Sequence, residues 1–443
     1  MVDGLARILA GGILLLASLS ALADPPVTLL IHGIVLDPTE HTNAWGDYDP
    51  DATAPEARWS GMIGALRTAG FRYGGELRAT NGAAPPDAQL IATGADTGPG
   101  NANLFVLQFS ASANTDGLAY RALELNACIK AATRLTGARQ VALVAHSAGG
   151  LVARAYLQDA LPGVPYGGDV ERLISIASPH LGSAMAASFG DLLGAQASSL
   201  KPGADLIRRL NLELPLPVQP RYASILVRGM GADARGTGSA QPAMMDTTFA
   251  AALPADLRTG GDQVVQVLSQ NLALAPAARH YEQASGRPVL FPLVRVNDPT
   301  PEDRLSLNET RVHEVATQDP AVHTLVIALL QSEPDPWGPK PPTDPAVLAQ
   351  ARLLAIGAVE RAAIARHPLS EVSAVDLREC RRTDLADGRV TFRFAGTAHT
   401  RGNLLQISRH QTEVSGTLWI QVDPFGRLIG SGTDRLVTRR LGG

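Results

Sequence analysis

The chain has few cysteines, no run of basic residues and no internal repeat. Because the net charge is −4 and basic residues do not cluster, nothing indicates a nucleic-acid partner. The two cysteines, Cys128 and Cys380, allow at most one disulfide, and the sequence leaves open whether they pair. Charged residues are only 18% and hydrophobic residues 45% of the 443 residues, so we expect the chain to bury a sizeable core and to be ordered over most of its length.

The apolar run at the N-terminus is short for spanning a bilayer. Arg7, the apolar stretch 8–19 and the small residues of 21–23 form the three parts of a secretory signal. We therefore predict that residues 1–23 are a cleaved signal peptide and that the mature protein is secreted or periplasmic. An uncleaved membrane anchor is the alternative, whereas bacterial-type lipid attachment at this position is excluded because no cysteine follows the run.

A proline-rich stretch, residues 332–344, predicts a semi-rigid linker between two domains. Before it, residues 24–331 alternate apolar strands with amphipathic helices, which favours an α/β fold with a mostly parallel sheet covered on both faces. After it, residues 345–443 predict a small α+β module of unknown role that folds separately. The expected strands of the larger domain are 27–31, 104–109, 141–144, 173–177, 223–227 and 289–296; those of the module are 390–394, 404–407, 417–422 and 428–433.

Residues 141–157 predict a buried strand, a sharp turn and a helix, with Ser147 at the turn. A strained turn of this kind needs small neighbours, which are Ala145 on one side and Ala148-Gly149-Gly150 on the other. A serine so placed is typical of the nucleophile elbow, here with Ala145 in the first glycine position of G-x-S-x-G. An ordinary strand–helix connection that happens to contain a serine is the alternative.

A serine nucleophile needs a base, and the base needs an orienting acid. In chains with this elbow, the acid and then the histidine follow the serine. Asp262, between two glycines and two valines, is the predicted acid, and His313, in a polar loop after the last strand, is the predicted base. The weaker rivals are Asp246 and Asp256 for the acid and His280 and His323 for the base.

Two backbone N–H groups are expected to form the oxyanion hole, those of Ile34 and Ala148. Ile34 follows His32-Gly33 directly after the first strand, and His32 itself is expected to be structural. A further segment, residues 184–220, carries leucines without a clean period. We interpret it either as a mobile cover over an apolar pocket or as plain helical packing.

Together, Ile31-His32-Gly33-Ile34, Ala145-His146-Ser147-Ala148-Gly149, Ser178-Pro179-His180-Leu181-Gly182, Gly261-Asp262-x-Val264-Val265 and His313 resemble secreted bacterial lipases of the α/β-hydrolase superfamily. The alanine-first elbow resembles the Bacillus-type lipases, and residues 200–206 resemble class 2 and inositol-deacylase-like lipases. The resemblance covers about residues 27–331 and implies an α/β-hydrolase fold.

We therefore expect an exported carboxylic ester hydrolase, lipase-like, that uses Ser147, His313 and Asp262 and needs no cofactor, with no metal-ligating residues assigned and metal binding left open. Its partners would be an ester or lipid substrate and a lipid–water interface, and the oligomeric state stays open. An acyltransferase or a polyester or thioester hydrolase of the same fold would share these residues. A non-catalytic binding protein of this fold is the alternative from another class.

Overall fold

The computed structural model describes most of the chain but not all of it. The described residues are 25–34, 45–54, 58–80, 86–110, 117–161, 165–189, 195–230, 260–262, 264–297, 311–331, 344–367, 370–386, 389–402, 409–422 and 428–441. The predicted signal peptide, Asp246, Asp256, nearly all of the predicted linker and the predicted strand 404–407 lie outside them. Within the described residues, no helix is long and apolar enough to cross a membrane.

The larger sheet has eight strands among the described residues. They are β1 (Thr28–Ile31), β2 (Tyr73–Ala79), β3 (Ala88–Ile91), β4 (Leu104–Gln108), β5 (Val141–His146), β6 (Val170–Ile176), β7 (Arg221–Met230) and β8 (Leu293–Asn297). Their order is β3-β2-β4-β1-β5-β6-β7-β8, and only β3 runs antiparallel to its neighbour. The strand before the predicted elbow, β5, therefore lies in the middle of the sheet, beside β1.

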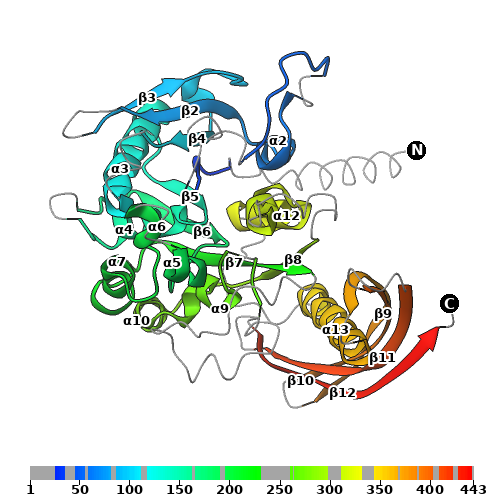
Figure 1. Cartoon of the computed structure of the whole chain (residues 1–443). Helices are drawn as coiled ribbons and strands as arrows, with labels where there is room; N and C mark the ends of the chain where they lie inside the picture. Colours follow the sequence, from blue (N-terminus) through cyan, green and yellow to red (C-terminus); the bar gives the residue numbers. More distant parts are fainter. Residues whose placement is uncertain are drawn as a thin grey trace, which may run out of the picture.

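Helices cover both faces of this sheet (Figure 1). The main ones are α2 (Gly61–Thr68), α3 (Gly117–Thr136), α4 (Gly149–Leu157), α10 (Pro276–Ser285), α11 (Arg311–Val315) and α12 (Pro320–Leu330). Alternate residues of β5 enter different cores: Leu143 packs in the cluster that contains α3 and α4, and Val144 packs in the cluster that contains α2 and α12. Because both faces are buried, the central strands are continuously apolar, as parallel strands require.

The segment after β6 folds into short helical turns. These are α5 (Ala184–Phe189), α6 (Ala195–Ser198), α7 (Asp205–Arg208) and the π-helical turn η4 (Arg209–Glu213). The later part is fixed to the elbow helix, because Arg154 of α4 donates to the Leu210 carbonyl and Asn211 donates to the His180 carbonyl. Residues 210 and 211 are therefore fixed beside the elbow helix, and the mobile cover predicted over residues 184–220 stays a prediction.

The C-terminal module is a separate four-stranded antiparallel sheet covered by one long helix. It consists of α13 (Asp344–Arg366), β9 (Ser370–Ala386), β10 (Arg389–Gly402), β11 (Arg409–Val422) and β12 (Leu428–Leu441), in the sheet order β12-β11-β10-β9. Phe392 and Phe394 of β10 are buried together with the alanine-rich face of α13. This part of the fold agrees with the predicted α+β module.

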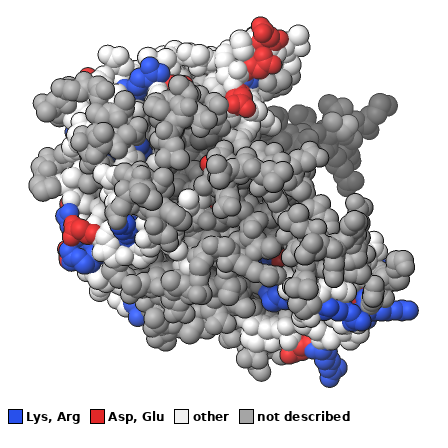
Figure 2. Space-filling model, in the orientation of Figure 1, with Lys and Arg blue, Asp and Glu red and all other residues white. Residues whose placement is uncertain are grey.

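An ion pair joins the module to the larger sheet. Arg295 of β8 contacts Glu360 of α13, and both side chains are largely buried. The sequence predicts a separate unit and contains no sign of this attachment. On the face drawn in Figure 2, acidic and basic side chains of the described residues form small separate groups, including several basic ones over the C-terminal sheet.

Several elements were not expected from the sequence. The helix α10, the strands β2 and β3 and the long strand β9 were missed. The strand predicted at 289–296 begins later, at Leu293, although Leu290 makes an isolated bridge to Ala223. The two cysteines do not form a disulfide: Cys128 is buried, with its thiol facing the Leu77 carbonyl, and Cys380 is half-buried in β9.

Candidate active site

Ser147 sits at a sharp turn between β5 and α4. Its φ angle is +53°, in the left-handed region that residues other than glycine rarely adopt, and its N–H donates to the Ile176 carbonyl. The neighbouring glycines are required by close packing. A Cβ atom on Gly149 would lie 2.8 Å from the His32 oxygen, and one on Gly150 would lie 2.3 Å from the Ser178 hydroxyl. The turn can therefore form only with these small residues.

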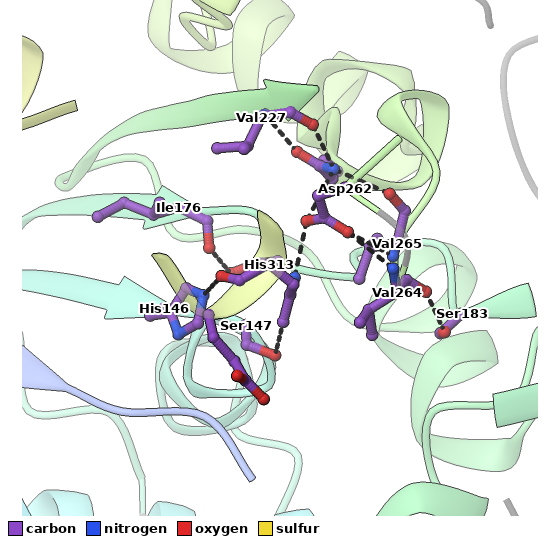
Figure 3. A network of polar contacts seen from close by, with 12 residues as sticks. His146, Ser147, Ile176, Ser183, Val227, Asp262, Val264, Val265 and His313 are labelled. Atoms are coloured by element: carbon purple, nitrogen blue, oxygen red, sulfur yellow. Dashed lines mark hydrogen bonds and ion pairs between the residues drawn. The ribbon is translucent and has the colours of Figure 1, made fainter. Parts of the chain in front are cut away.

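The predicted serine, histidine and aspartate lie in one line of hydrogen bonds (Figure 3). The Ser147 Oγ is 2.7 Å from His313 Nε2, and His313 Nδ1 is 2.7 Å from Asp262 Oδ2. Asp262 is fully buried and His313 is 6% exposed, whereas Ser147 is partly exposed. The serine hydroxyl therefore lies at the accessible end of this line of hydrogen bonds, and the Asp262 carboxyl group at its other end is shielded from water.

Asp262 is fixed by its own turn and by Gln270. Its Oδ1 accepts from the N–H groups of Val264 and Val265 at 3.0 and 2.7 Å, and Gln270 Nε2 lies 3.2 Å from Oδ2. Gln270 is in turn paired with both backbone groups of Val227 on β7. The aspartate therefore keeps one oxygen free of backbone donors and aimed at His313. Sequence reasoning missed Gln270, which no local pattern marks.

His313 lies in the short helix α11 and not in a loop as predicted. The helix is anchored by Val312, which is fully buried in the core that also contains α2 and α12. The two rival histidines are placed elsewhere. His280 is exposed on α10, and His323, on α12, faces the Thr317 carbonyl at 2.8 Å.

His146, directly before the serine, also contacts the base. Its Nε2 lies 3.0 Å from the main-chain oxygen of His313, and the two rings lie 4.8 Å apart between centroids. Burial, together with the neighbouring His313, holds the pKa of His146 well below its usual value, so its ring is neutral. Sequence reasoning assigned no role to this residue, although it belongs to the quoted elbow motif.

The two segments that carry the predicted oxyanion donors both lie next to Ser147. Gly33 packs directly against the serine, since a Cβ atom there would lie 2.6 Å from Ser147 Cβ, and Ile34 follows it, half-buried. Ala148 is the buried residue at the start of α4, where N–H groups point toward the serine side of the turn. The structure thus brings the loop after β1 and the start of α4 to the same serine.

A buried arginine holds the loop that carries Ile34. Arg121 of α3 donates from Nη1 to the Gly33 oxygen at 2.9 Å, and His32 Nδ1 lies 2.8 Å from the same oxygen. Burial lowers the pKa of Arg121 to about 10, and nearby Glu124 opposes that shift, so the guanidinium is charged at neutral pH. Since the C=O of Gly33 and the N–H of Ile34 belong to one planar peptide unit, holding the first orients the second.

Within the described part of the chain, no group of three or more His, Cys, Asp or Glu side chains is arranged to hold a metal ion.

Residues 105–192 match the family described as PGAP1-like alpha/beta domain. This segment contains nearly all of β4 together with α3, β5, α4, β6 and α5, and therefore Ser147 itself. The mostly parallel sheet covered by helices, with Ser147 at the turn after its central strand, agrees with the α/β-hydrolase fold that the sequence predicts. No curated protein is significantly similar to it in sequence.

Several solved structures are similar at low identity. They include the lin2722 gene product of Listeria innocua (14% identity, 70% of this chain and 95% of that chain covered, TM-score 0.39). Lipase BlEst2 of Bacillus licheniformis in its mature form is 15% identical, with 70% and 93% of the two chains covered and a TM-score of 0.39. Phospholipase PlaB of Legionella pneumophila is 14% identical, with 70% and 60% covered and a TM-score of 0.37.

Proposed function

We propose that the protein is a serine carboxylic ester hydrolase that acts on lipid-like esters. The observation that carries this proposal is the unbroken line from Ser147 Oγ through the His313 ring to Asp262, with both distances at 2.7 Å. A serine that is partly exposed on a strained turn, backed by a buried histidine and aspartate, is suited to attack an acyl carbon.

In the first half of the reaction, Ser147 Oγ bonds to the ester carbonyl carbon while His313 Nε2 takes the hydroxyl proton. The Asp262 carboxylate stabilises the imidazolium through Nδ1. The carbonyl oxygen becomes an oxyanion that accepts from the N–H groups of Ile34 and Ala148. The bond to the alcohol then breaks, and His313 returns the proton to the leaving alkoxide oxygen, which leaves an acyl-enzyme on Ser147.

In the second half of the reaction, His313 takes a proton from a water molecule while the oxygen of that water attacks the acyl carbon. The serine oxygen leaves with the proton from His313, and the carboxylic acid is released. These steps require no group beyond the substrate, water and this chain's own residues. We also propose that the substrates are lipid-like esters, that the protein is exported and that it associates with a lipid surface.

The decisive experiment compares wild-type protein with Ser147→Ala on nitrophenyl esters of increasing acyl chain length. Alanine fits the small turn, so the variant should fold normally and lose turnover on every ester. A fluorophosphonate probe should label wild-type protein on the Ser147 peptide and leave the variant unlabelled. If the folded variant retained turnover, Ser147 would not be the nucleophile; if folded wild-type protein cleaved none of the esters, ester hydrolysis itself would be excluded.

A second measurement concerns the lipid–water interface. The early part of the segment after β6 begins beside the acid, because the Ser183 hydroxyl donates to the Val264 carbonyl at 2.7 Å. A cover formed there should raise specific activity when an ester passes from monomers to an emulsion. Equal specific activity in both states would contradict interfacial activation. It would not affect the proposal that Ser147 is the nucleophile.

A further inference from the structure

His146 connects the residue before the nucleophile to the main chain of the base. Its backbone ends β5, so it is covalently joined to Ser147, while its side chain reaches the His313 carbonyl oxygen at 3.0 Å. Figure 3 shows the two histidines side by side, with the His313 ring turned toward the serine and the aspartate. His146 is 7% exposed, so water competes little for this contact.

The chemistry of the two atoms fixes the direction of this hydrogen bond. A carbonyl oxygen can only accept, so the contacting nitrogen of His146 must carry the proton and donate. Because burial keeps the ring neutral, the proton is on Nε2 and the other ring nitrogen is unprotonated. His146 therefore adds no positive charge beside a base that itself becomes charged during the reaction.

The base is consequently held at two places. Asp262 holds the ring through Nδ1, and His146 holds the main chain through the carbonyl oxygen. His146 and Ser147 are consecutive in the chain, and they contact the backbone and the ring, respectively, of the same histidine. These two contacts together set the spacing between Ser147 Oγ and His313 Nε2, which is 2.7 Å.

We propose that His146 is a positioning residue that fixes His313 at proton-transfer distance from Ser147 by donating a hydrogen bond to its main-chain oxygen. This inference rests on the proposed function, because His146 affects the reaction only through His313, the proposed base. It differs from a packing role in one respect: the donor on His146 matters, and the bulk of the ring does not.

The test uses three substitutions that separate donor from bulk. His146→Gln keeps an N–H donor close to the position of Nε2, His146→Asn keeps the amide but is too short to reach, and His146→Leu keeps bulk without a donor. On a small soluble ester, kcat should fall about 10- to 100-fold in the Asn and Leu variants, with KM within about twofold, because small misplacements of a catalytic group cost rates of this order. The Gln variant should stay within a few-fold of wild type.

A spectroscopic measurement tests the inference without any substrate. The His313 Nδ1 proton shared with Asp262 should give a low-field proton resonance in wild-type protein. That resonance should persist in His146→Gln and broaden or disappear in His146→Asn and His146→Leu. Because it reports the base directly, it separates this inference from the proposed function, which the Ser147→Ala comparison tests on its own.

The matched control is His180→Leu. His180 is a fully buried histidine bonded through Nε2 to the Ser175 hydroxyl, 2.9 Å away, and it contacts none of the three site residues in the hydrogen bonds described. This variant should lose stability but keep kcat and the low-field resonance. Equal kcat and an unchanged resonance in the Gln and Asn variants would overturn the proposal, and that pair decides the matter even if the Leu variant does not fold.

Discussion

Gly33 lies so close to Ser147 that a methyl group between them has no room: a Cβ on residue 33 would be 2.6 Å from Ser147 Cβ and 3.1 Å from its Oγ. Either the serine or the loop that carries Ile34 would have to move. Gly33→Ala should therefore lower kcat/KM on a soluble ester by about 100-fold, since it disturbs nucleophile and oxyanion donor together.

The matched control for this change is Gly98→Ala. A Cβ on Gly98 would meet nothing within 4 Å, and its φ of −63° suits any residue. This variant should keep wild-type kcat/KM. An active Gly33→Ala enzyme would show that the loop after β1 is looser than its contacts with Arg121 and His32 indicate.

The identity of the base can be decided among three histidines. His313→Ala should lower kcat by several powers of ten and leave a small residue of catalysis from the oxyanion hole. His280→Ala and His323→Ala should lower kcat at most a few-fold. If His280→Ala were inactive and His313→Ala active, His280 and not His313 would be the base.

Stability should fall as the pH is lowered below about 6.5, the usual pKa of histidine. Burial holds the pKa values of His146, His180 and His323 below that value in the folded state. The unfolded chain then binds more protons than the folded one, so the free energy of unfolding rises with pH across this window.

The effect of one histidine can be isolated by substitution. His180→Asn should be less stable at pH 8 but should have a shallower pH dependence below pH 6.5, by about 1.4 kcal/mol per pH unit for the single proton no longer taken up on unfolding. Urea unfolding at a series of pH values measures this difference. Parallel curves for the two proteins would mean that His180 is charged in the folded state.

The ion pair between Arg295 and Glu360 should contribute measurably to stability. With side chains only 3% and 11% exposed, the pair is largely shielded from water, and Glu360→Ala should reduce the free energy of unfolding by about 3 kcal/mol. Glu413→Ala is the matched control, because its pair with Arg378 is far more exposed and should be worth no more than about 1 kcal/mol. Equal losses would show that the module is not held by this contact.

The sequence predicts those parts of the fold whose signals are local. The apolar runs of β1 and β5 and the cap of α12, where the Asp319 side chain accepts from the Ala321 N–H, are recognisable within a few residues. The order in which serine, aspartate and histidine follow one another along the chain predicts the other two residues of the candidate site. All three then meet within hydrogen-bonding distance.

The missed elements have weak local signals. The strand β2 contains Gly74-Gly75, where Gly75 has a φ of +112° and the pairing with β4 shifts register, so it does not resemble a regular strand. The charged strand β9 is stabilised mainly by pairing with β10. His146 and Gln270 act through partners far along the chain, and no spacing rule reveals such contacts.

The two cysteines provide one built-in reporter for each half of the molecule. Cys128 is fully buried on α3, and burial raises its thiol pKa, so a thiol reagent reaches it only when the larger core opens. Cys380 lies half-buried in β9, and burial raises its pKa to about 11. Labelling at Cys128 would therefore time the opening of the larger core, and labelling at Cys380 would report on the C-terminal sheet, in the natural sequence and without any added probe.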